Sequence, residues 1–506
     1  MLNNLPREII EEIFSYFCLH CRNVFKSPNG VGTIYQHNGP HPRLKADEKS
    51  WYSIDRHALY SLTLTCKKLH PIAENVLYHE FAPGYGCAAW SDLYTFEGRL
   101  TSFMRTVGRR KDLAAKVRVL FIHRWLPASQ STEDTVESLR QGAADLGVDI
   151  VTGWQRRASR ARHGKDQEWF TGPNNSRSIY LDTMSSAFTT NITDLRARHP
   201  DWRNLWTRFN HELIPMLIAL LPNVEHITFR NMSFWHAFED DPFEALGITR
   251  LPNLRSLETS ADDFLIIDKA INLEVLNLSC LSPWSNSGPA YQAAKIRTIR
   301  LAGARHLPTN ISSPLTFAAK DLRSFVYQAV QENCSWDWMM SSPTFNAEEV
   351  VELLKDYRET LETLHLDFRG AIRTPSDPPL YSRNFSLRDF TRLSDVFLST
   401  GILFDVSNSL NENVTSDEII SDSITRRMPS SIVSLHLASD GARIQDTERG
   451  LIGLADTKKR HLDRFPCLQN IGSDFDGRLH KLVHRAMEEA EISLVYENWP
   501  REDEAK

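Results

Sequence analysis

The sequence is poor in cysteine, has no strong excess of either charge and contains no long hydrophobic run. Its seven cysteines among 506 residues are few and scattered, which disfavours a disulfide framework and favours a reducing compartment, cytoplasmic or nuclear. The net charge of −6 disfavours nucleic acid as a main partner, because dedicated duplex binders usually carry a basic surplus. No apolar run approaches the ~20 residues that span a bilayer, and the start lacks a basic segment followed by an apolar one. We therefore expect neither a membrane partner nor a secretory signal.

The sequence also lacks the short motifs of the common enzyme classes. It contains no phosphate-binding loop of the GxxxxGK(S/T) type, no HExxH, no GxSxG and no kinase signature set. His365 and His436 fall at outward positions of expected strands, and the pattern pairs neither of them with a base or carboxylate. We therefore predict a protein that is not an enzyme, with no catalytic residue and no cofactor.

The residues that are present form an ordinary globular composition, 41% apolar and 24% charged, which is enough for a large core. The first eighty residues predict three short helices. Apolar residues recur at helical spacing from Ile9 to Phe17, and Pro6 suits the first turn of that helix. Asp55 can cap a second helix, and Pro71 can open a third.

Two blocks of this region resemble an F-box, most closely the F-boxes of filamentous fungi. The first block reads LPREI and IFSYF between Leu5 and Phe17, and the second reads DRHALYSLTLTCKKL from Asp55 and ends with LY at Tyr78. An insertion at about residues 18–54 lies where the family normally has only a few residues. The resemblance implies a helical domain that binds the small adaptor subunit of an SCF ubiquitin ligase and, through it, a cullin.

The resemblance also assigns the adaptor-binding side chains. F-box helices present apolar residues to the adaptor, and in such interfaces a few buried anchors supply most of the affinity. The residues at the matching positions are Leu5, Pro6, Ile9, Ile13, Leu59, Leu62 and Leu69. In so small a unit each of them could instead belong to the core of the domain itself, and the sequence leaves that alternative open.

A pair of cysteines and a pair of histidines near the start have the spacing of a two-Cys, two-His zinc site. Cys18 and Cys21 are followed by His37 and His41 in the insertion. A zinc finger that reads DNA needs both histidines on one helix, whereas Asn-Gly-Pro separates these two and would break such a helix. We expect a surface loop without a metal, with a non-helical metal clip as the alternative.

A motif of the form apolar-x-x-apolar-x-apolar recurs through the rest of the chain and predicts leucine-rich repeats. Its ten copies begin at Val117, Val224, Leu254, Leu273, Ile296, Leu322, Leu361, Leu393, Ile432 and Leu468. The three apolar residues of each copy turn inward along a strand, and one repeat buries too little to be stable alone, so the repeats must stack. From Val224 onward the copies start 19 to 39 residues apart, which predicts an irregular solenoid.

These patterns together predict an α/β chain, with a short F-box helical domain before an irregular leucine-rich-repeat horseshoe built as a strand–helix solenoid. The expected parts are an F-box at 1–80, linker helices and a first repeat at 81–126, a largely irregular insertion at 127–205, the solenoid at 206–475, and a capping helix with a tail at 476–506. The insertion is expected to be irregular because its middle has few aliphatic residues and many Ser, Arg, Gly and Asn.

The predicted function is a substrate-recruiting subunit of an SCF-type ubiquitin ligase, acting in ubiquitin-dependent degradation. The outward strand residues would contact an unknown target protein on the concave face; they are Thr228, Arg230, Glu258, Asn277, Arg300, His365, Asp367 and His436. Two alternatives stay open: a leucine-rich-repeat scaffold that acts outside a ligase, and a zinc-dependent nucleic-acid binder.

Overall fold

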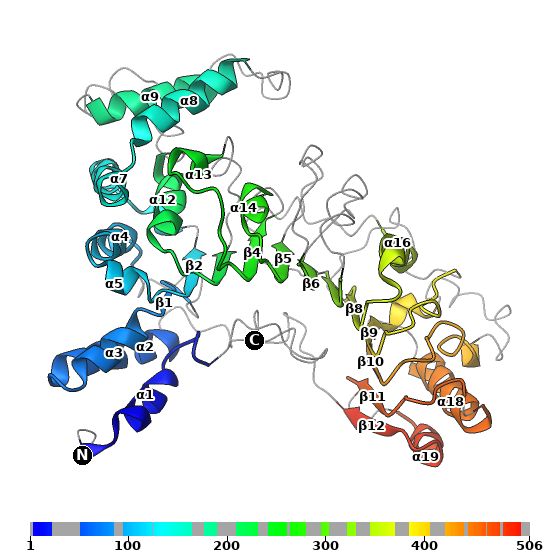
Figure 1. Ribbon diagram of the computed structural model, residues 1–506. Coiled ribbons are helices and arrows are strands. Elements are labelled where there is room, and N and C mark those ends of the chain that lie inside the picture. Colours follow the sequence, from blue (N-terminus) through cyan, green and yellow to red (C-terminus); the bar gives the residue numbers. More distant parts are fainter. Residues whose placement is uncertain are drawn as a thin grey trace. The chain divides into compact units, whose positions relative to one another are not determined.

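The computed structural model describes residues 4–22, 51–85, 95–123, 125–163, 177–189, 209–230, 241–260, 264–279, 295–302, 321–329, 345–369, 384–404, 420–439, 444–461, 463–475 and 479–496. The chain divides into two compact units, residues 1–25 with 44–273 and residues 26–43 with 274–506. Each unit contains both helices and parallel strands, so the fold is of the α/β class (Figure 1).

Three helices form the start of the first unit: α1 (Arg7–Ser15), α2 (Trp51–Thr65) and α3 (His70–Leu77). Pro6 precedes α1, and Pro71 lies in the first turn of α3; both positions tolerate proline because the first turn of a helix leaves its N–H groups unpaired. Helix α2 begins at Trp51, before Asp55, so the prediction that Asp55 caps this helix is wrong.

The three helices share one hydrophobic core, which brings together the two sequence blocks on either side of the insertion. Residues three and four apart share a helix face, so each helix buries one apolar face in this core. The buried members are Ile10, Phe14, Cys18, Leu59, Leu69, Ile72, Ala73 and Val76. The two blocks therefore fold as one small helical unit.

The strands of the first unit are β1 (Glu80–Phe81), β2 (Val119–His123), β3 (His226–Arg230) and β4 (Ser256–Ser260). The pairs β1–β2, β2–β3 and β3–β4 are parallel, and the strand order follows the chain order. Helices α4 (Arg99–Arg109) and α5 (Lys111–Ala114) precede β2, while α13 (Pro242–Ala245) and α14 (Phe264–Lys269) precede and follow β4.

The expected irregular insertion at 127–205 is instead largely helical in its described part, so that prediction is wrong. It holds α7 (Thr132–Leu146), α8 (Ile150–His163) and α9 (Arg177–Thr189), preceded by α6 (Trp125–Ala128) and followed by α12 (Leu213–Leu220). The side chain of Ser131 caps α7 by accepting from the Asp134 amide, and Gly147 ends it in the left-handed conformation that glycine adopts without strain.

A buried ion pair anchors the helical insertion to the rest of the first unit. Arg157 of α8 donates to Glu212 at 2.9 Å, just before α12, and Trp154 donates its indole N–H to the same carboxylate at 3.2 Å. Both members of the pair are almost completely buried. A sequence rich in Arg is therefore compatible with an ordered helix here, because one of its arginines has a buried carboxylate partner.

In its described residues, the second unit contains eight strands: β5 (Val275–Ser279), β6 (Thr298–Ala302), β7 (Ser324–Gln328), β8 (Thr363–Asp367), β9 (Asp395–Ser399), β10 (Ser434–Ala438), β11 (Asn470–Ser473) and β12 (Ser493–Tyr496). Neighbours pair in parallel and in chain order. The connections include α16 (Ala347–Leu353), the short 3₁₀ turns η5 (Lys355–Tyr357) and η6 (Thr400–Ile402), α18 (Ile444–Arg460) and α19 (Lys481–Glu489).

Every copy of the repeated motif forms a strand, which begins two residues after the first apolar residue of the motif. The copy at Leu361 gives β8 from Thr363, for example, and the degenerate copy at Leu468 gives β11 from Asn470. The inward residues of all ten copies are buried, none with more than 6% of its surface exposed. Burial of these positions is thus the driving force for the strands, as the period-two pattern implies.

Two strands were not predicted. β1 is only two residues long and directly follows the third helix. β12 lies within the segment expected to be a capping helix at 476–506, where the structure has α19 followed by a strand that pairs with β11. None of the helices in the described ranges is long and apolar enough to cross a bilayer.

Candidate functional site

The first candidate site is the outer surface of the three N-terminal helices. Helix α1 buries Ile10 and Phe14 in the shared core, whereas Ile9 has 48% of its surface exposed. A helix that only closes a core would carry polar residues outside its buried face. Ile9 is therefore an apolar side chain that a partner could bury.

The seven predicted adaptor contacts divide into two groups. Pro6 and Ile9 are exposed, and Leu5, Ile13 and Leu62 are half-buried, packed at the margin of the core. Leu59 and Leu69 are buried in the core itself, so their prediction as contact residues is wrong; they face inward because the other two helices cover that side of α2 and of the turn before α3. Two of the seven therefore hold the domain together.

Exposed apolar side chains gather on this helical region. Nine large apolar residues are exposed in the described part of the chain: Ile9, Tyr16, Ile54, Tyr60, Leu64, Trp125, Ile271, Leu482 and Val495. Five of them lie on α1, α2 and the residue that caps α1, although these make up a small part of the protein. Tyr16, Ile54, Tyr60 and Leu64 were not among the predicted contacts. The sequence does contain a signal for the three on α2, because this helix has more apolar residues than one buried face can hold.

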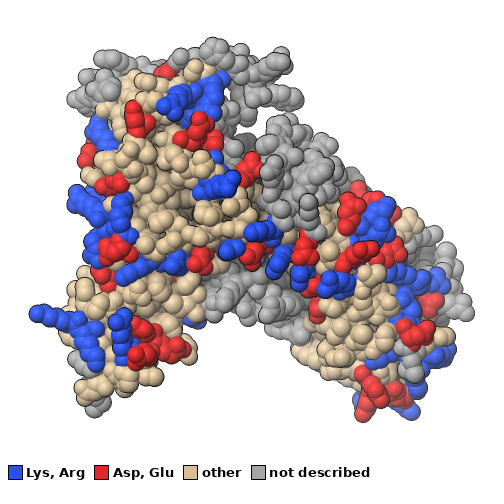
Figure 2. Space-filling model, viewed as in Figure 1, with Lys and Arg blue, Asp and Glu red and all other residues tan. Residues whose placement is uncertain are grey.

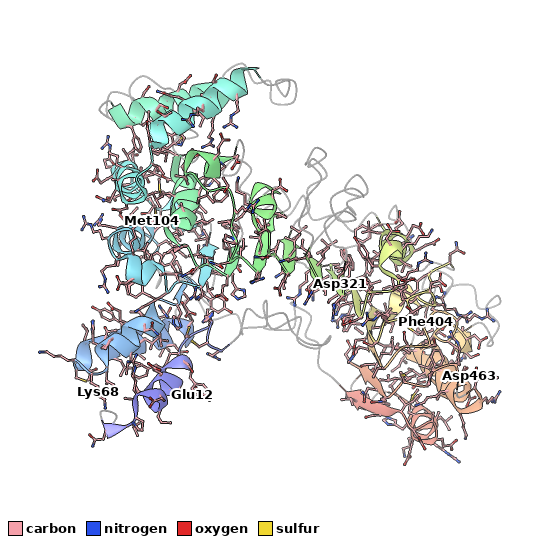
Figure 3. The ribbon with its side chains drawn as sticks, viewed as in Figure 1. Glu12, Lys68, Met104, Asp321, Phe404 and Asp463 are labelled. Carbon is pink, nitrogen blue, oxygen red and sulfur yellow. The ribbon has the colours of Figure 1, made fainter. Side chains whose placement is uncertain are left out.

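Charged residues border this apolar surface. Figure 2 shows uncharged surface over the N-terminal helices, interrupted by a group of acidic side chains and by separate basic ones. Glu12 of α1 and Lys68, in the turn before α3, are both exposed (Figure 3). Lys68 also donates to the backbone carbonyl of Leu5 at 3.3 Å, which fastens the start of α1 to this turn. An apolar centre with a polar rim is typical of protein interfaces.

The second candidate site is the outward side of the strands, where the target contacts were expected. In the second unit the register aligns one residue from each of the strands β5 to β10, and we call these residues the outer row: Asn277, Arg300, Val326, His365, Phe397 and His436. Four members of the row are predicted contacts: Asn277, Arg300, His365 and His436. The other two, Val326 on β7 and Phe397 on β9, are apolar and were not predicted as contacts.

The predicted target contacts are less accessible than expected. Thr228, Arg300, His365 and Asp367 are buried, so they are not the free surface that the prediction required. Glu258, Asn277 and His436 are half-buried, and Arg230 lies at the end of β3 with its side chain outside the described residues. Adjacent parallel strands lie ~4.8 Å apart, so large neighbours along a row cover one another.

His365 shows how the outer row packs. Its ring stacks on Phe397 of the next strand, with the ring centroids 3.8 Å apart and the planes 6° from parallel. Burial lowers the pKa of His365 to about 3, and the cations of Arg369 and Arg300 act in the same direction against the opposing charge of Asp367. His365 is thus a neutral, stacked residue near pH 7, which fits a structural role.

A buried ion-pair cluster lies next to this residue in the second unit. Arg369 pairs with Asp367, just before it in the chain, and with Asp474, which follows β11, each at 3.0 Å. Asp474 also accepts from the Ser439 amide at 2.8 Å, so it joins the ends of β10 and β11. The guanidinium of Arg369 is nearly inaccessible, so this cluster stabilises the strand ends.

In the first unit, residues from the N-terminal region cover the outward side of the first strands. Tyr85 lies edge-on against Phe121 of β2, with the ring centroids 5.2 Å apart, and against Tyr52 of α2 at 5.3 Å. Leu19 belongs to the same buried cluster. The helical region is therefore packed directly on the start of the sheet, and this end of the outward face is occupied.

One group among the described residues could hold a metal ion: Cys18, His20, Cys21 and His79. Cys18 and Cys21 were singled out from the sequence, but with His37 and His41, which lie outside the described residues. The hydrogen bond that the two thiols share lowers the pKa of Cys21, assisted by both histidines, and the same bond together with burial raises the pKa of Cys18. The spacing pattern did not indicate His20 and His79, because that pattern requires two histidines close together after the cysteine pair.

Two comparisons with known proteins, with family models and with curated proteins, found no match: no model of a protein family matches the chain, and no curated protein matches it significantly.

Proposed function

We propose that this protein is a substrate-recruiting subunit of an SCF-type ubiquitin ligase, in which the N-terminal helices dock the adaptor subunit and the strand–helix repeats hold a target protein. The observation that carries the proposal is the concentration of exposed apolar side chains on α1 and α2. A concentration of exposed apolar side chains is typical of a protein-binding site, since burying them on a partner is favourable.

The packing of the two F-box-like blocks supports the same proposal. The blocks resemble an F-box only if they fold together, and the shared core of α1, α2 and α3 meets that condition despite the long insertion between them. The predicted contacts Pro6, Ile9, Leu5, Ile13 and Leu62 lie at or near the surface of this unit. Because Leu59 and Leu69 are buried, we no longer propose them as adaptor contacts. We propose Tyr16 and Leu64 instead, because both are exposed apolar residues of the same helical unit.

In this proposal the strand-forming motif copies are leucine-rich repeats, and they would bind the target. Within the outer row, the half-buried Asn277 and His436 remain the accessible polar candidates, and Glu258 is the equivalent in the first unit. The role is non-catalytic: binding a target beside a ligase raises the effective concentration of its lysines near the conjugating enzyme, and needs no reactive group of this chain.

A capture experiment with matched isoleucines tests the docking surface. Ile9→Glu places a charge on the proposed interface, whereas Ile271→Glu makes the same change at a similarly exposed residue (40% against 48%) after α14. We expect Ile9→Glu to weaken capture of the SCF adaptor at least about tenfold, because a central apolar anchor is worth more than about 1.4 kcal/mol. Ile271→Glu should capture it as the unchanged chain does.

Equal capture by both variants would contradict the docking surface. Capture of a target without any adaptor by the unchanged chain would favour the alternative function, a repeat scaffold that acts outside a ligase. Because both side chains are exposed, both variants should keep the melting temperature of the unchanged protein, which serves as the folding control.

A further inference from the structure

The chain directly after α1 folds into a turn that brings two thiols together. The Cys18 amide donates to the Ser15 carbonyl at 3.1 Å, and the Arg22 amide donates to the Cys18 carbonyl at 3.0 Å. This single helix-like turn places Cys18 and Cys21, three residues apart, on the same side of the backbone. Cys18 is buried, and Cys21 is half-buried.

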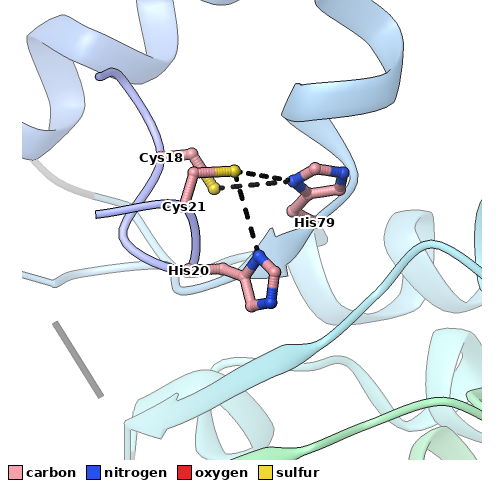
Figure 4. A group of neighbouring side chains, drawn as sticks. All are labelled: Cys18, His20, Cys21 and His79. Atoms are coloured by element: carbon pink, nitrogen blue, oxygen red, sulfur yellow. Dashed lines mark hydrogen bonds between the residues drawn. The ribbon is translucent and has the colours of Figure 1, made fainter. Parts of the chain in front are cut away.

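A histidine from a distant part of the sequence faces these thiols. His79 lies between α3 and β1, and its carbonyl accepts from the amides of Arg118 and Val119 at 2.7 and 3.1 Å, so the neighbouring strand fixes its backbone. Its Nδ1 atom lies 3.2 Å from the sulfur of Cys21 and 3.8 Å from the sulfur of Cys18 (Figure 4). The imidazole therefore points between the two sulfurs.

His20 completes a group of four. Its Nδ1 atom lies 3.9 Å from the sulfur of Cys21, and the four potential ligand atoms all lie within 4.8 Å of one another (Figure 4). Zinc bonds of about 2.3 Å to sulfur and about 2.0 Å to nitrogen require ligand atoms about 3.3 to 3.8 Å apart in a tetrahedron. The observed spacing needs only a small contraction to reach that geometry.

A buried carboxylate holds the turn and the first strand together around this group. Glu80, the first residue of β1, accepts from the His20 amide at 3.1 Å, and without a metal it also accepts from the Cys18 thiol at 3.3 Å. Its other oxygen pairs with Arg56 of α2 at 3.3 Å. The bond from the His20 amide fixes the backbone of one ligand, as outer partners do in structural metal sites; the bond from the thiol is lost when Cys18 binds as a thiolate.

Two other uses of these residues fit the geometry less well. A disulfide between Cys18 and Cys21 would leave two imidazoles converging on it without a role. Simple core packing would explain a buried thiol, since free cysteine behaves as a small apolar residue. It would not explain why two thiols and two imidazoles from segments about sixty residues apart meet at one point.

We propose that Cys18, His20, Cys21 and His79 bind one Zn²⁺ ion in a closed, four-coordinate structural site. Both cysteines bind as thiolates, and any proton that the pair still carries passes to water, so two negative sulfurs balance the charge of the ion. With four protein ligands no position stays open for substrate. The ion would fasten the turn after α1 to the residue before β1, and thus the helical unit to the sheet. The site does not depend on whether the helices dock an adaptor.

Metal analysis of the unchanged full-length chain is the first test. The protein is produced with zinc in the medium and passed through metal-free buffer before elemental analysis, and we expect about one zinc per chain. Replacement of the zinc by Co²⁺ should give the charge-transfer absorption of thiolate–cobalt bonds. Zinc absent from the folded, unchanged chain, or cobalt bound without that absorption, would overturn the proposal, as would a Cys18–Cys21 disulfide in freshly purified protein.

Matched variants identify the ligands. In Cys21→Ser and His79→Ala we expect the zinc content to fall to less than about one-tenth of the unchanged level, because a structural site needs its full ligand set. Cys66→Ser, at a half-buried cysteine of the same helical unit, and a combined His37→Ala, His41→Ala variant should keep about one zinc per chain.

The histidine variants separate the proposed set from the pair suggested by sequence spacing. Loss of zinc with His37 and His41 replaced, but retention in His79→Ala, would assign the metal to the other pair and overturn the proposal. If the ligand variants do not fold, the test is to remove zinc from the unchanged chain with a chelator and then to add it back. We expect the melting temperature to fall after chelation and to recover when zinc is added. An unchanged melting temperature would contradict a structural ion.

Discussion

The N-terminal helices and the outer row of the second unit differ in which side chains they expose and which they bury. The helices expose apolar side chains such as Ile9 and Leu64, whereas the outer row buries polar ones such as Arg300 and His365. An exposed apolar side chain lowers the stability of the folded protein little, and a partner can bury it on binding. A buried polar side chain, by contrast, needs hydrogen-bond or charge partners inside the protein. The difference supports the proposal that the helices carry a docking surface, and it suits a structural role for much of the outer row.

Breaking the buried ion-pair cluster should have the largest effect on stability. Arg369→Ala leaves Asp367 and Asp474 buried without their cation, and we expect the free energy of unfolding to fall by about 3–5 kcal/mol. The exposed pair of Arg426 and Asp422 gives the control, since Arg426→Ala should cost less than about 1 kcal/mol. Urea titration of the full chain measures both. Equal, small losses would show that this part of the outward face is not structural.

A pair of leucines on α2 tests the comparison within one helix. Leu59 has none of its surface exposed and Leu64 has 68% exposed. Leu59→Ala should lower the free energy of unfolding by about 2–5 kcal/mol because it leaves a cavity in the core. Leu64→Ala should change it by less than about 0.5 kcal/mol but weaken adaptor capture. A large loss of stability in Leu64→Ala would mean that the apolar surface of α2 is core.

The third prediction concerns the pH dependence of stability. The folded pKa of His365, about 3, lies below the ordinary value of 6.5, so the unfolded chain binds a proton more readily. The contribution of His365 to stability is complete above about pH 6.5 and falls on acidification, by at most about 1.4 kcal/mol per pH unit, until about pH 3. Asp367, Arg369, His436 and Arg300 set the local field around it.

His365→Phe removes this titration and keeps an aromatic ring against Phe397. The difference in unfolding free energy between the variant and the unchanged chain should therefore shift in favour of the variant as the pH falls from 6.5. Carboxylates elsewhere titrate equally in both proteins and cancel in the difference. A difference that stays constant over this range would show that His365 is protonated in the folded protein.

The sequence was most informative where burial imposes a period on the chain. The three apolar positions of each motif copy predicted ten strands, because inward residues of a strand alternate with outward ones. The same alternation does not reveal what covers the outward side, so the burial of His365 and Thr228 could not be predicted. Nor did it reveal β12, whose residues alternate between exposed and half-buried instead of occupying the core.

Partners that are distant in the sequence account for most of the remaining differences. The insertion was expected to be irregular partly because it is rich in Arg, and the sequence does not reveal that Arg157 has a buried partner, Glu212, 55 residues away. Cys18 and Cys21 were paired with His37 and His41, whereas the structure places His20 and His79 beside them. Leu59 and Leu69 were assigned to the interface because the resemblance to an F-box identifies apolar positions only. It does not distinguish residues that face the adaptor from residues that pack between the helices.

Hydrogen–deuterium exchange on the full chain, with and without the purified adaptor subunit, tests the central claim most directly. The account predicts slower exchange on adding the adaptor for backbone amides of α1, α2 and the turn before α3, and no change in β8, β9 and β10. No protection anywhere, or protection confined to those strands, would contradict the assignment of the docking surface to the N-terminal helices.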